Sequence, residues 1–208
     1  MRSFGFGSGL KLVLTVIGLA LAAGPLTAGE VSLTQTAKGI DVTIDGQAFT
    51  SFSASKEFAK PFFLPVRAAD GTAVTRVLEN PEDHPHHKGM WFSLDEVNGL
   101  NFWAEKARIE TKSFEIVKAK GNPAVLKYVA HWLGEDGQPL LEEATETRIF
   151  DNRMFAFSFE LKAVSKAVHF EDTKEGMFGI RLPNGMREKE TGKVVNAEGL
   201  KTTKECWG

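Results

Sequence analysis

The chain is poor in cysteine and has no excess of basic residues. Cys206 is its only cysteine, so no disulfide can form within the chain, and a cross-linked scaffold is excluded. Lysine and arginine total 25 against 27 aspartates and glutamates. A nucleic-acid surface needs clustered basic residues to replace counterions, so no nucleic-acid partner is expected. The residues after the first 28 fit one domain of ordinary size and can bury a hydrophobic core without cross-links.

General catalytic motifs are also missing. The sequence has no Gly-x-Ser-x-Gly elbow, no Walker phosphate loop and no His-Glu-x-x-His helix. Nucleotide chemistry is therefore not expected, and any chemistry must come from residues outside these motifs.

The first 28 residues have the composition of an export signal. Arg2 and Lys11 precede an apolar run over residues 12–23, and the small residue Ala28 closes the segment. This run is shorter than the about 20 residues that a membrane span needs. We predict a signal peptide over residues 1–28 that is cleaved, with an uncleaved signal anchor as the alternative. The mature protein, with a formal charge of about −4, is expected to be periplasmic or secreted, without a stable membrane span.

Period-two alternation of apolar and polar residues dominates the remainder. It is clear at residues 31–34 and 40–44 and is typical of strands with one buried face. Four further strands are expected at residues 109–119, 124–133, 140–150 and 154–161, separated by Gly-, Asn-, Asp- and Pro-containing turns. Consecutive hairpins indicate antiparallel pairing. We predict an all-β fold, an antiparallel β-sandwich or large barrel, with residues 29–208 as a single domain.

Three of the chain's five histidines, His84, His86 and His87, lie within four positions. Histidine titrates near neutrality and serves as a general acid or base, so we predict all three as catalytic candidates. In an extended segment His84 and His86 would share a face while His87 points away. Pro81 and Pro85 favour a rigid loop over residues 80–88. The alternatives are a surface cluster without function or a structural metal site.

No cofactor is predicted. The His84-Pro85-His86 step resembles the metal-binding jelly rolls of the cupin type, but Met90 and Trp91 stand where a glutamate ligand follows in those proteins. A transition metal at His84 and His86 remains an alternative, with Glu96 or His131 as further ligands.

Two more groups could contribute to a site. Trp91 and Trp103 could stack on a sugar ring while Asn98 bonds its hydroxyls, although ordinary core tryptophans are the alternative. Charged residues crowd positions 170–181, where Glu175 near the histidines would complete an acid–base pair and Arg181 could bind hydroxyls or a carboxylate. A solvated loop is the alternative for this stretch.

Three stretches, residues 83–92, 97–103 and 172–181, together resemble a family of exported bacterial proteins labelled "methane oxygenase PmoA". The resemblance covers most of residues 40–208 and implies that the domain is incomplete at its C-terminus. The methane monooxygenase subunit of that name spans the membrane several times, which this sequence does not predict after residue 28. The resemblance instead suggests a sandwich similar to the galactose mutarotase fold, in which histidines and a carboxylate act on a sugar.

These observations predict an exported carbohydrate-active protein whose partner is a carbohydrate or another small molecule. Epimerisation, hydrolysis and elimination all remain open as the reaction. The alternatives are a non-catalytic glycan-binding or cell-surface module and a metal-dependent oxygenase.

Overall fold

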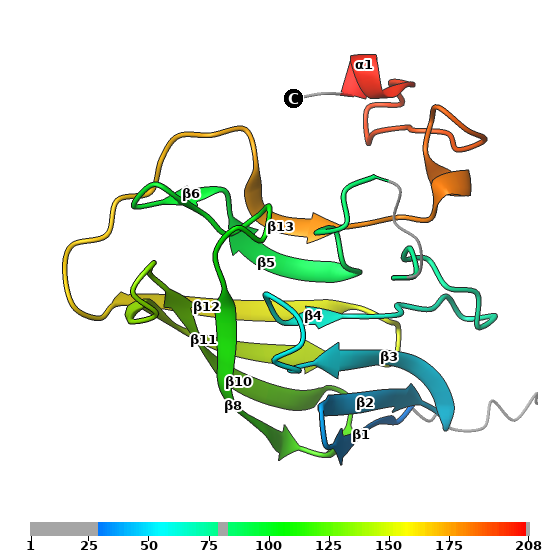
Figure 1. The fold of residues 1–208 in the computed structure, drawn as a ribbon. Coiled ribbons are helices and arrows are strands. Elements are labelled where there is room, and N and C mark those ends of the chain that lie inside the picture. The colour runs from blue at the N-terminus through cyan, green and yellow to red at the C-terminus, as the bar shows by residue number, and fades with distance from the viewer. Residues whose placement is uncertain (1–28, 79–82, 207–208) are drawn as a thin grey trace, which may run out of the picture.

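The computed structural model describes residues 29–78 and 83–206, so the predicted signal peptide at residues 1–28 lies outside the described residues. The described chain forms two antiparallel sheets and a short hairpin (Figure 1). The larger sheet has the strand order β13 (Gly176–Ile180), β5 (Met90–Leu94), β4 (Phe62–Phe63), β3 (Gln47–Ser53), β2 (Gly39–Ile44), β1 (Val31–Thr36) and β9 (Lys120–Gly121). The smaller sheet has the order β12 (Phe155–Ala163), β11 (Pro139–Ile149), β10 (Ala124–Leu133) and β8 (Ile109–Lys118). The predicted all-β antiparallel sandwich is confirmed.

The smaller sheet forms where the alternating sequence predicts it. Along β10, buried residues alternate with more exposed ones, as expected for a strand with one face on a core. The predicted row of phenylalanines in β12 is present: the ring centroids of Phe155 and Phe157 lie 5.7 Å apart, and those of Phe157 and Phe159 lie 5.6 Å apart. This row faces the larger sheet.

Aromatic side chains join the two sheets. Phe52 of β3 stacks on Tyr128 of β10 at 4.9 Å, and Phe92 of β5 stacks on Phe159 of β12 at 4.0 Å. Burial of a side chain of this size stabilises a fold by about 1.5–3 kcal/mol. The core between the sheets therefore fixes β5, the strand that follows the histidines.

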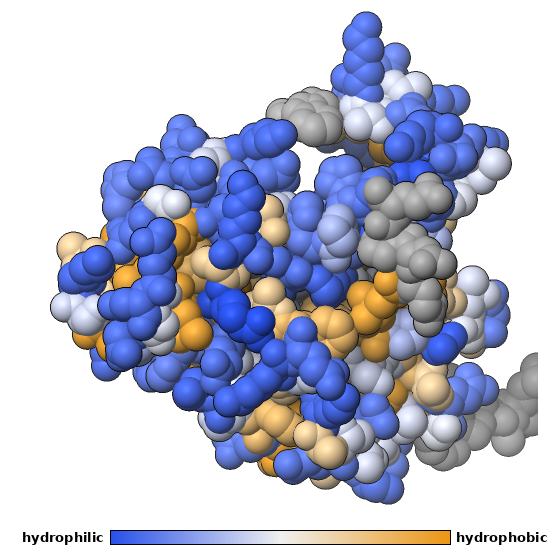
Figure 2. Space-filling model, in the orientation of Figure 1, coloured by the Kyte–Doolittle hydropathy of each residue, from blue (hydrophilic) through white to orange (hydrophobic). Residues whose placement is uncertain are grey.

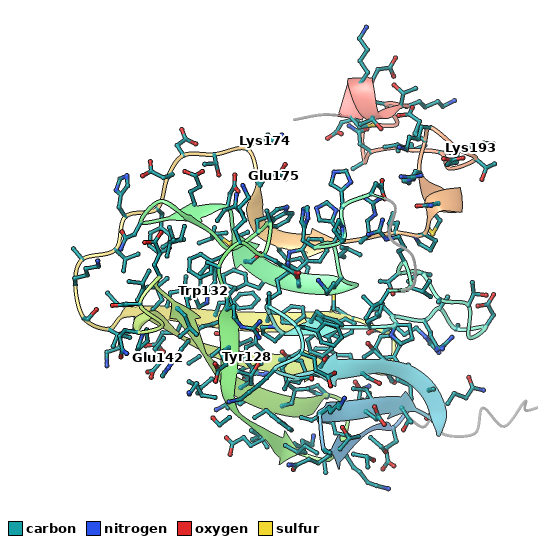
Figure 3. The ribbon with its side chains drawn as sticks, in the orientation of Figure 1. Tyr128, Trp132, Glu142, Lys174, Glu175 and Lys193 are labelled. Carbon is teal, nitrogen blue, oxygen red and sulfur yellow. The ribbon has the colours of Figure 1, made fainter. Side chains whose placement is uncertain are left out.

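A buried carboxyl group lies inside this core, where the sequence pattern gave no sign of one. Glu143 of β11 is 0% exposed, and its oxygens accept hydrogen bonds from Tyr128 Oη at 2.7 Å, Thr145 Oγ1 at 2.8 Å and Trp132 Nε1 at 2.8 Å. Burial raises the pKa of Glu143, and the three hydrogen bonds oppose that rise. We call these four residues the interior cluster; Figure 3 shows Tyr128 and Trp132 within the sandwich.

The segment after β13, described as far as residue 206, is irregular. It contains the short helices η1 (Asn184–Met186) and α1 (Thr203–Cys206), which lie away from β1 and β2 in Figure 1. Figure 2 shows that hydrophilic residues cover much of this view, with hydrophobic ones visible between them. No helix in residues 29–78 and 83–206 is long and apolar enough to cross a membrane.

The pairing of β5 with β13 positions the candidate site. Met90 at the start of β5 pairs with Ile180 at the end of β13. Because the strands are antiparallel, the histidines before β5 and Arg181 after β13 meet at the same end of the sheet. The backbone amide of Arg181 donates to the carbonyl of Gly89 at 2.7 Å, which fixes this junction.

Candidate acid–base site at the histidine loop

The three histidines gather in a tight turn, which we call the histidine loop (residues 83–88). The amide of His87 donates to the carbonyl of His84 at 3.0 Å. Ring centroids lie 4.7 Å apart for His84 and His87, 4.5 Å for His86 and His87, and 5.8 Å for His84 and His86. The prediction that His87 points away from the other two is therefore wrong, because the segment turns where an extended chain was assumed.

The backbone carbonyl groups of the loop point toward basic side chains. All five carbonyl oxygens from residue 83 to residue 87 accept hydrogen bonds from basic side chains. The pairs are Asp83 with Arg76 (3.0 Å), His84 with Arg76 (2.8 Å), Pro85 with Lys88 (3.1 Å), His86 with Lys60 (2.8 Å) and His87 with Arg76 (3.4 Å). Hydrogen bonds to charged donors are stronger than neutral ones, so these contacts hold the turn in one conformation.

The side chain of Asp83 joins three arginines from separate parts of the chain. Its oxygens accept from Arg76 at 2.6 Å, from Arg181 at 3.0 Å to each oxygen, and from Arg187 at 2.8 Å. Desolvation acts to raise the pKa of Asp83, but the hydrogen bonds and charges of the surrounding cations outweigh it and hold the pKa well below its usual range. Asp83 is thus an anion at neutral pH.

Burial keeps two of the imidazoles neutral. The pKa of His87 is lowered to about 3, first by burial and then by the charges of His86, His84, Arg181 and Lys60. The pKa of His86 is also lowered, chiefly by burial and by the charge of Lys60. A neutral imidazole has one nitrogen that donates and one that accepts.

The neighbours of His84 and His87 assign the ring protons. Nδ1 of His84 lies 3.5 Å from an oxygen of Asp83, and a carboxylate only accepts, so Nδ1 carries hydrogen and Nε2 of neutral His84 is free to take a proton. Nδ1 of His87 lies 3.4 Å from Nη1 of Arg181, which only donates, so the proton of His87 is on Nε2. His84 is thus arranged as a base, and His87, which stacks on it, is arranged as a hydrogen-bond donor.

Trp91 and Trp103 lie beneath the histidines rather than on the surface. They are 3% and 8% exposed and pack with Phe62. The ring of His87 stacks on Trp91 at a centroid distance of 5.1 Å. The predicted stacking platform for a sugar is therefore wrong, because these rings form the floor of the histidine loop.

Two glycines make this packing possible. A Cβ on Gly179 would lie 2.4 Å from Trp91, so only glycine lets that indole pack against β13. Gly89 follows the loop with φ of +57°, and a Cβ there would lie 2.1 Å from the carbonyl oxygen of Phe63. Both residues are needed for the loop to close against the sheet.

The structure does not bring Glu175 to the histidines. Glu175 precedes β13, whereas the loop lies at the other end of that strand, where Ile180 pairs with Met90. The five residues of β13 span roughly 16 Å at about 3.3 Å each, so the predicted acid–base pair is not formed. Figure 3 shows Glu175 beside Lys174, and their ion pair measures 3.6 Å.

Asn98 also lies apart from the histidine loop. It occupies the turn between β6 (Glu96–Val97) and β7 (Leu100–Asn101). Its side-chain oxygen accepts from the amide of His169 at 2.8 Å, and its own amide donates to the carbonyl of His169 at 2.9 Å. This side chain holds two loops together, and the predicted contact between Asn98 and the tryptophan site is absent. Of the predicted binding residues, Arg181 contacts a ring nitrogen of the loop, at Nδ1 of His87, while Trp91 and Trp103 pack against the ring of His87 from below.

The predicted metal alternative finds no supporting geometry in the parts of the chain described. Among residues 29–78 and 83–206, histidine, cysteine, aspartate and glutamate side chains form no group of three or more arranged to hold a metal ion. His131 instead pairs with Glu142 at 3.5 Å on the smaller sheet. Glu96 lies in β6.

Sequence reasoning missed the residues that hold the loop: Lys60, Arg76, and Glu105, whose carboxylate accepts from both Lys60 and Lys88. Lys60 and Arg76 carry no motif, and they lie 26 and 7 residues before the loop carbonyls that they bind at His86 and Asp83. Asp83 was visible as the neighbour of His84, and an adjacent acid is a signal that could have suggested an oriented histidine.

The fold and the site define the class of protein: an antiparallel β-sandwich with a histidine-rich polar site at one end of the larger sheet. The chain belongs to the family described as "Family of unknown function (DUF6807)", whose model matches residues 39–208. Neither the curated proteins nor the solved structures give a significant match.

Proposed function

We propose that this chain is a carbohydrate-active protein in which the histidine loop moves a proton on a sugar or glycoside. The observation that carries the proposal is the stacked pair of His84 and His87, 4.7 Å apart with opposite partners. His84 faces the carboxylate of Asp83, and His87 faces the guanidinium of Arg181. A base beside a donor is what proton transfer on a hydroxyl group requires.

In this proposal Nε2 of His84 takes the proton from a sugar hydroxyl. Asp83 orients the ring and stabilises the imidazolium that forms. Nε2–H of His87 donates to an oxygen on which negative charge develops. Asp83 thereby takes the part first expected of Glu175. The choice of a sugar as the substrate follows from the sequence resemblance described above, which suggests a sandwich similar to the galactose mutarotase fold, where histidines and a carboxylate act on sugars.

The test uses the full chain with a panel of reducing sugars and polysaccharides. NMR would follow exchange between anomers, and reducing-end assays would follow bond cleavage. His84→Gln should lower any turnover by about 10²- to 10⁴-fold, the usual contribution of a positioned base. The matched control is His131→Gln, because His131 lies on β10 and should leave turnover unchanged. Equal activity in both variants would contradict the proposal.

Two further outcomes correspond to the other proposals. Glycan binding without turnover, retained in His84→Gln, would favour a binding or cell-surface module. Stoichiometric iron or copper in purified protein, lost in a His84→Ala, His86→Ala double variant, would favour the oxygenase that the "methane oxygenase PmoA" label suggests. Export is part of the proposal too, and mass spectrometry of the mature N-terminus tests it. Cleavage near Ala28 would support export, and an intact N-terminus would contradict it.

A further inference from the structure

A buried lysine lies beneath the histidine loop and has no part in the proposed chemistry. The side chain of Lys60 is 0% exposed. Its ammonium donates to the carbonyl of His86 at 2.8 Å, to the carbonyl of Trp103 at 3.2 Å and to Oε1 of Glu105 at 2.9 Å. It also lies 5.4 Å from the centroid of the Trp91 ring. Its three protons are therefore directed at a carbonyl of the loop, a carbonyl of the floor beneath it and the carboxylate of Glu105.

Glu105 extends this contact to the end of the loop. Its other oxygen, Oε2, accepts from Lys88, whose ammonium also donates to the carbonyl of Pro85 at 3.1 Å. One carboxylate thus connects two cations that hold neighbouring carbonyls of the loop. The side chain of Glu105 is 15% exposed and that of Lys88 is 13% exposed, so solvent screens this network little.

Stability alone gives no reason for a buried lysine at this place. Taking an ammonium group out of water is costly, and a buried ion pair is often no more stable than apolar residues of the same volume. Burial lowers the pKa of Lys60 to about 8, with Glu105 acting against that change, which reflects the cost of desolvation. An unbranched apolar side chain could fill the space beside Trp91, but it could not bind carbonyl oxygens.

We infer that Lys60 is a positioning residue: its ammonium, balanced by Glu105, fixes the carbonyl of His86 and so places the imidazoles above the tryptophan floor. The inference rests on the proposed function for its catalytic meaning. Its test measures the protonation of the histidine rings and needs no sugar. Failure of the inference about Lys60 can therefore be distinguished from failure of the proposed function.

The test follows the five histidine rings by NMR in the full chain between about pH 2.5 and 8, so that the range includes the lowered pKa of His87. The groups facing His86 are Lys60, Lys88, Glu105 and His84, and those facing His87 are His84, His86, Arg181 and Lys60. In Lys60→Met the pKa values of both His86 and His87 should rise, because a nearby positive charge is lost. Ring contacts between His87 and Trp91 should weaken in the same variant, because the carbonyl of His86 is released.

Glu105→Gln separates positioning by charge from simple loosening of the loop. Removal of this carboxylate should lower the pKa of His86, because Glu105 acts to raise it and the charges of Lys60 and Lys88 remain. Loosening would instead let water reach the ring and raise the pKa of His86 toward its ordinary value. His131 and His169, which pair with Glu142 and Glu171, serve as internal controls, and their ring signals should be the same in wild type and variants.

Opposite shifts of His86 in the two variants would support the inference. A rise in both, or no shift in either, would overturn it. If Lys60→Met fails to fold, Glu105→Gln alone decides, since only a lowered pKa of His86 agrees with the inference.

Discussion

Two polar clusters of this molecule are buried in different ways. The interior cluster places Glu143 at 0% exposure with both carboxylate oxygens hydrogen bonded to protein donors. The histidine loop buries its backbone carbonyls on cations but leaves the side chain of His84 53% exposed. The first cluster is closed to solvent and its carboxylate is fully bonded, whereas the second presents ring nitrogens to solvent.

This difference indicates which cluster is suited to chemistry. A group that reacts with a ligand must be reachable and must have a free lone pair or proton, and Nε2 of His84 satisfies both conditions. Glu143 satisfies neither, although the pKa values of Glu143 and His87 both depart from the ordinary range. A perturbed pKa therefore distinguishes a functional group from a structural one only when the exposure of the group to solvent is considered as well.

The largest expected effect belongs to the interior cluster. Glu143→Leu leaves donors on Tyr128, Trp132 and Thr145 without an acceptor, and each unsatisfied buried donor costs about 1–3 kcal/mol. We expect the free energy of unfolding to fall by about 3–6 kcal/mol, measured by urea denaturation. A fall below about 1 kcal/mol would mean that this cluster does not hold the sheet together.

The two clusters should respond to pH in opposite directions. The pKa of Glu143 in the folded chain is raised above 4.5, so the unfolded chain ionises first as pH rises. The stability that depends on this group is therefore greatest below about pH 4.5 and is lost as pH rises toward the folded pKa. Glu143→Gln should remove that loss. Parallel profiles of wild type and variant in chemical denaturation would contradict the raised pKa.

His87 should show the reverse. Its pKa is lowered from 6.5 to about 3, so the unfolded chain binds a proton first as pH falls. The stability that depends on neutral His87 is present above pH 6.5 and is lost as pH falls from there toward 3. His87→Gln should reduce the loss of stability in acid. This change in the free energy of unfolding should be smaller than that of Glu143→Leu, because His87 is only half-buried. If thermal melts showed the same loss of stability below pH 6.5 in wild type and variant, a neutral, desolvated ring would be contradicted.

The smallest effect is expected from Glu175, which lies at the far end of β13 from the loop. Glu175→Gln should leave the pKa values of the loop histidines and any turnover within error of wild type. Asp83→Asn is the matched comparison, because it removes the carboxylate that does contact His84. If Glu175→Gln abolished turnover while Asp83→Asn did not, the assignment of the carboxylate would be reversed.

The sheets were predictable because each strand carries its own evidence. The predicted strands at 109–119, 124–133 and 140–150 differ from β8, β10 and β11 by one residue at most at either end. Alternation and turn residues are local, so one sequence contains them. The position of Glu175 was not predictable, because it depends on which end of β13 meets the histidine loop.

The histidine site was visible only in part. The cluster of three histidines marked the place, but the turn at His84, where φ is +45°, gathers the rings in a way that an extended reading could not foresee. The tryptophans were assigned to a surface because burial depends on Phe62 and Gly179, which come from other strands. Lys60 and Arg76 were missed because they bind backbone oxygens, and such contacts leave no sequence motif.

The most direct test of the histidine site is the protonation of His87 in the unaltered chain at neutral pH. Long-range proton–nitrogen NMR spectra distinguish a ring protonated on Nε2 from one protonated on Nδ1 and from an imidazolium. We expect a neutral ring with its proton on Nε2, because Arg181 faces Nδ1 at 3.4 Å. A charged ring, or a proton on Nδ1, would contradict the division of roles between His84 and His87.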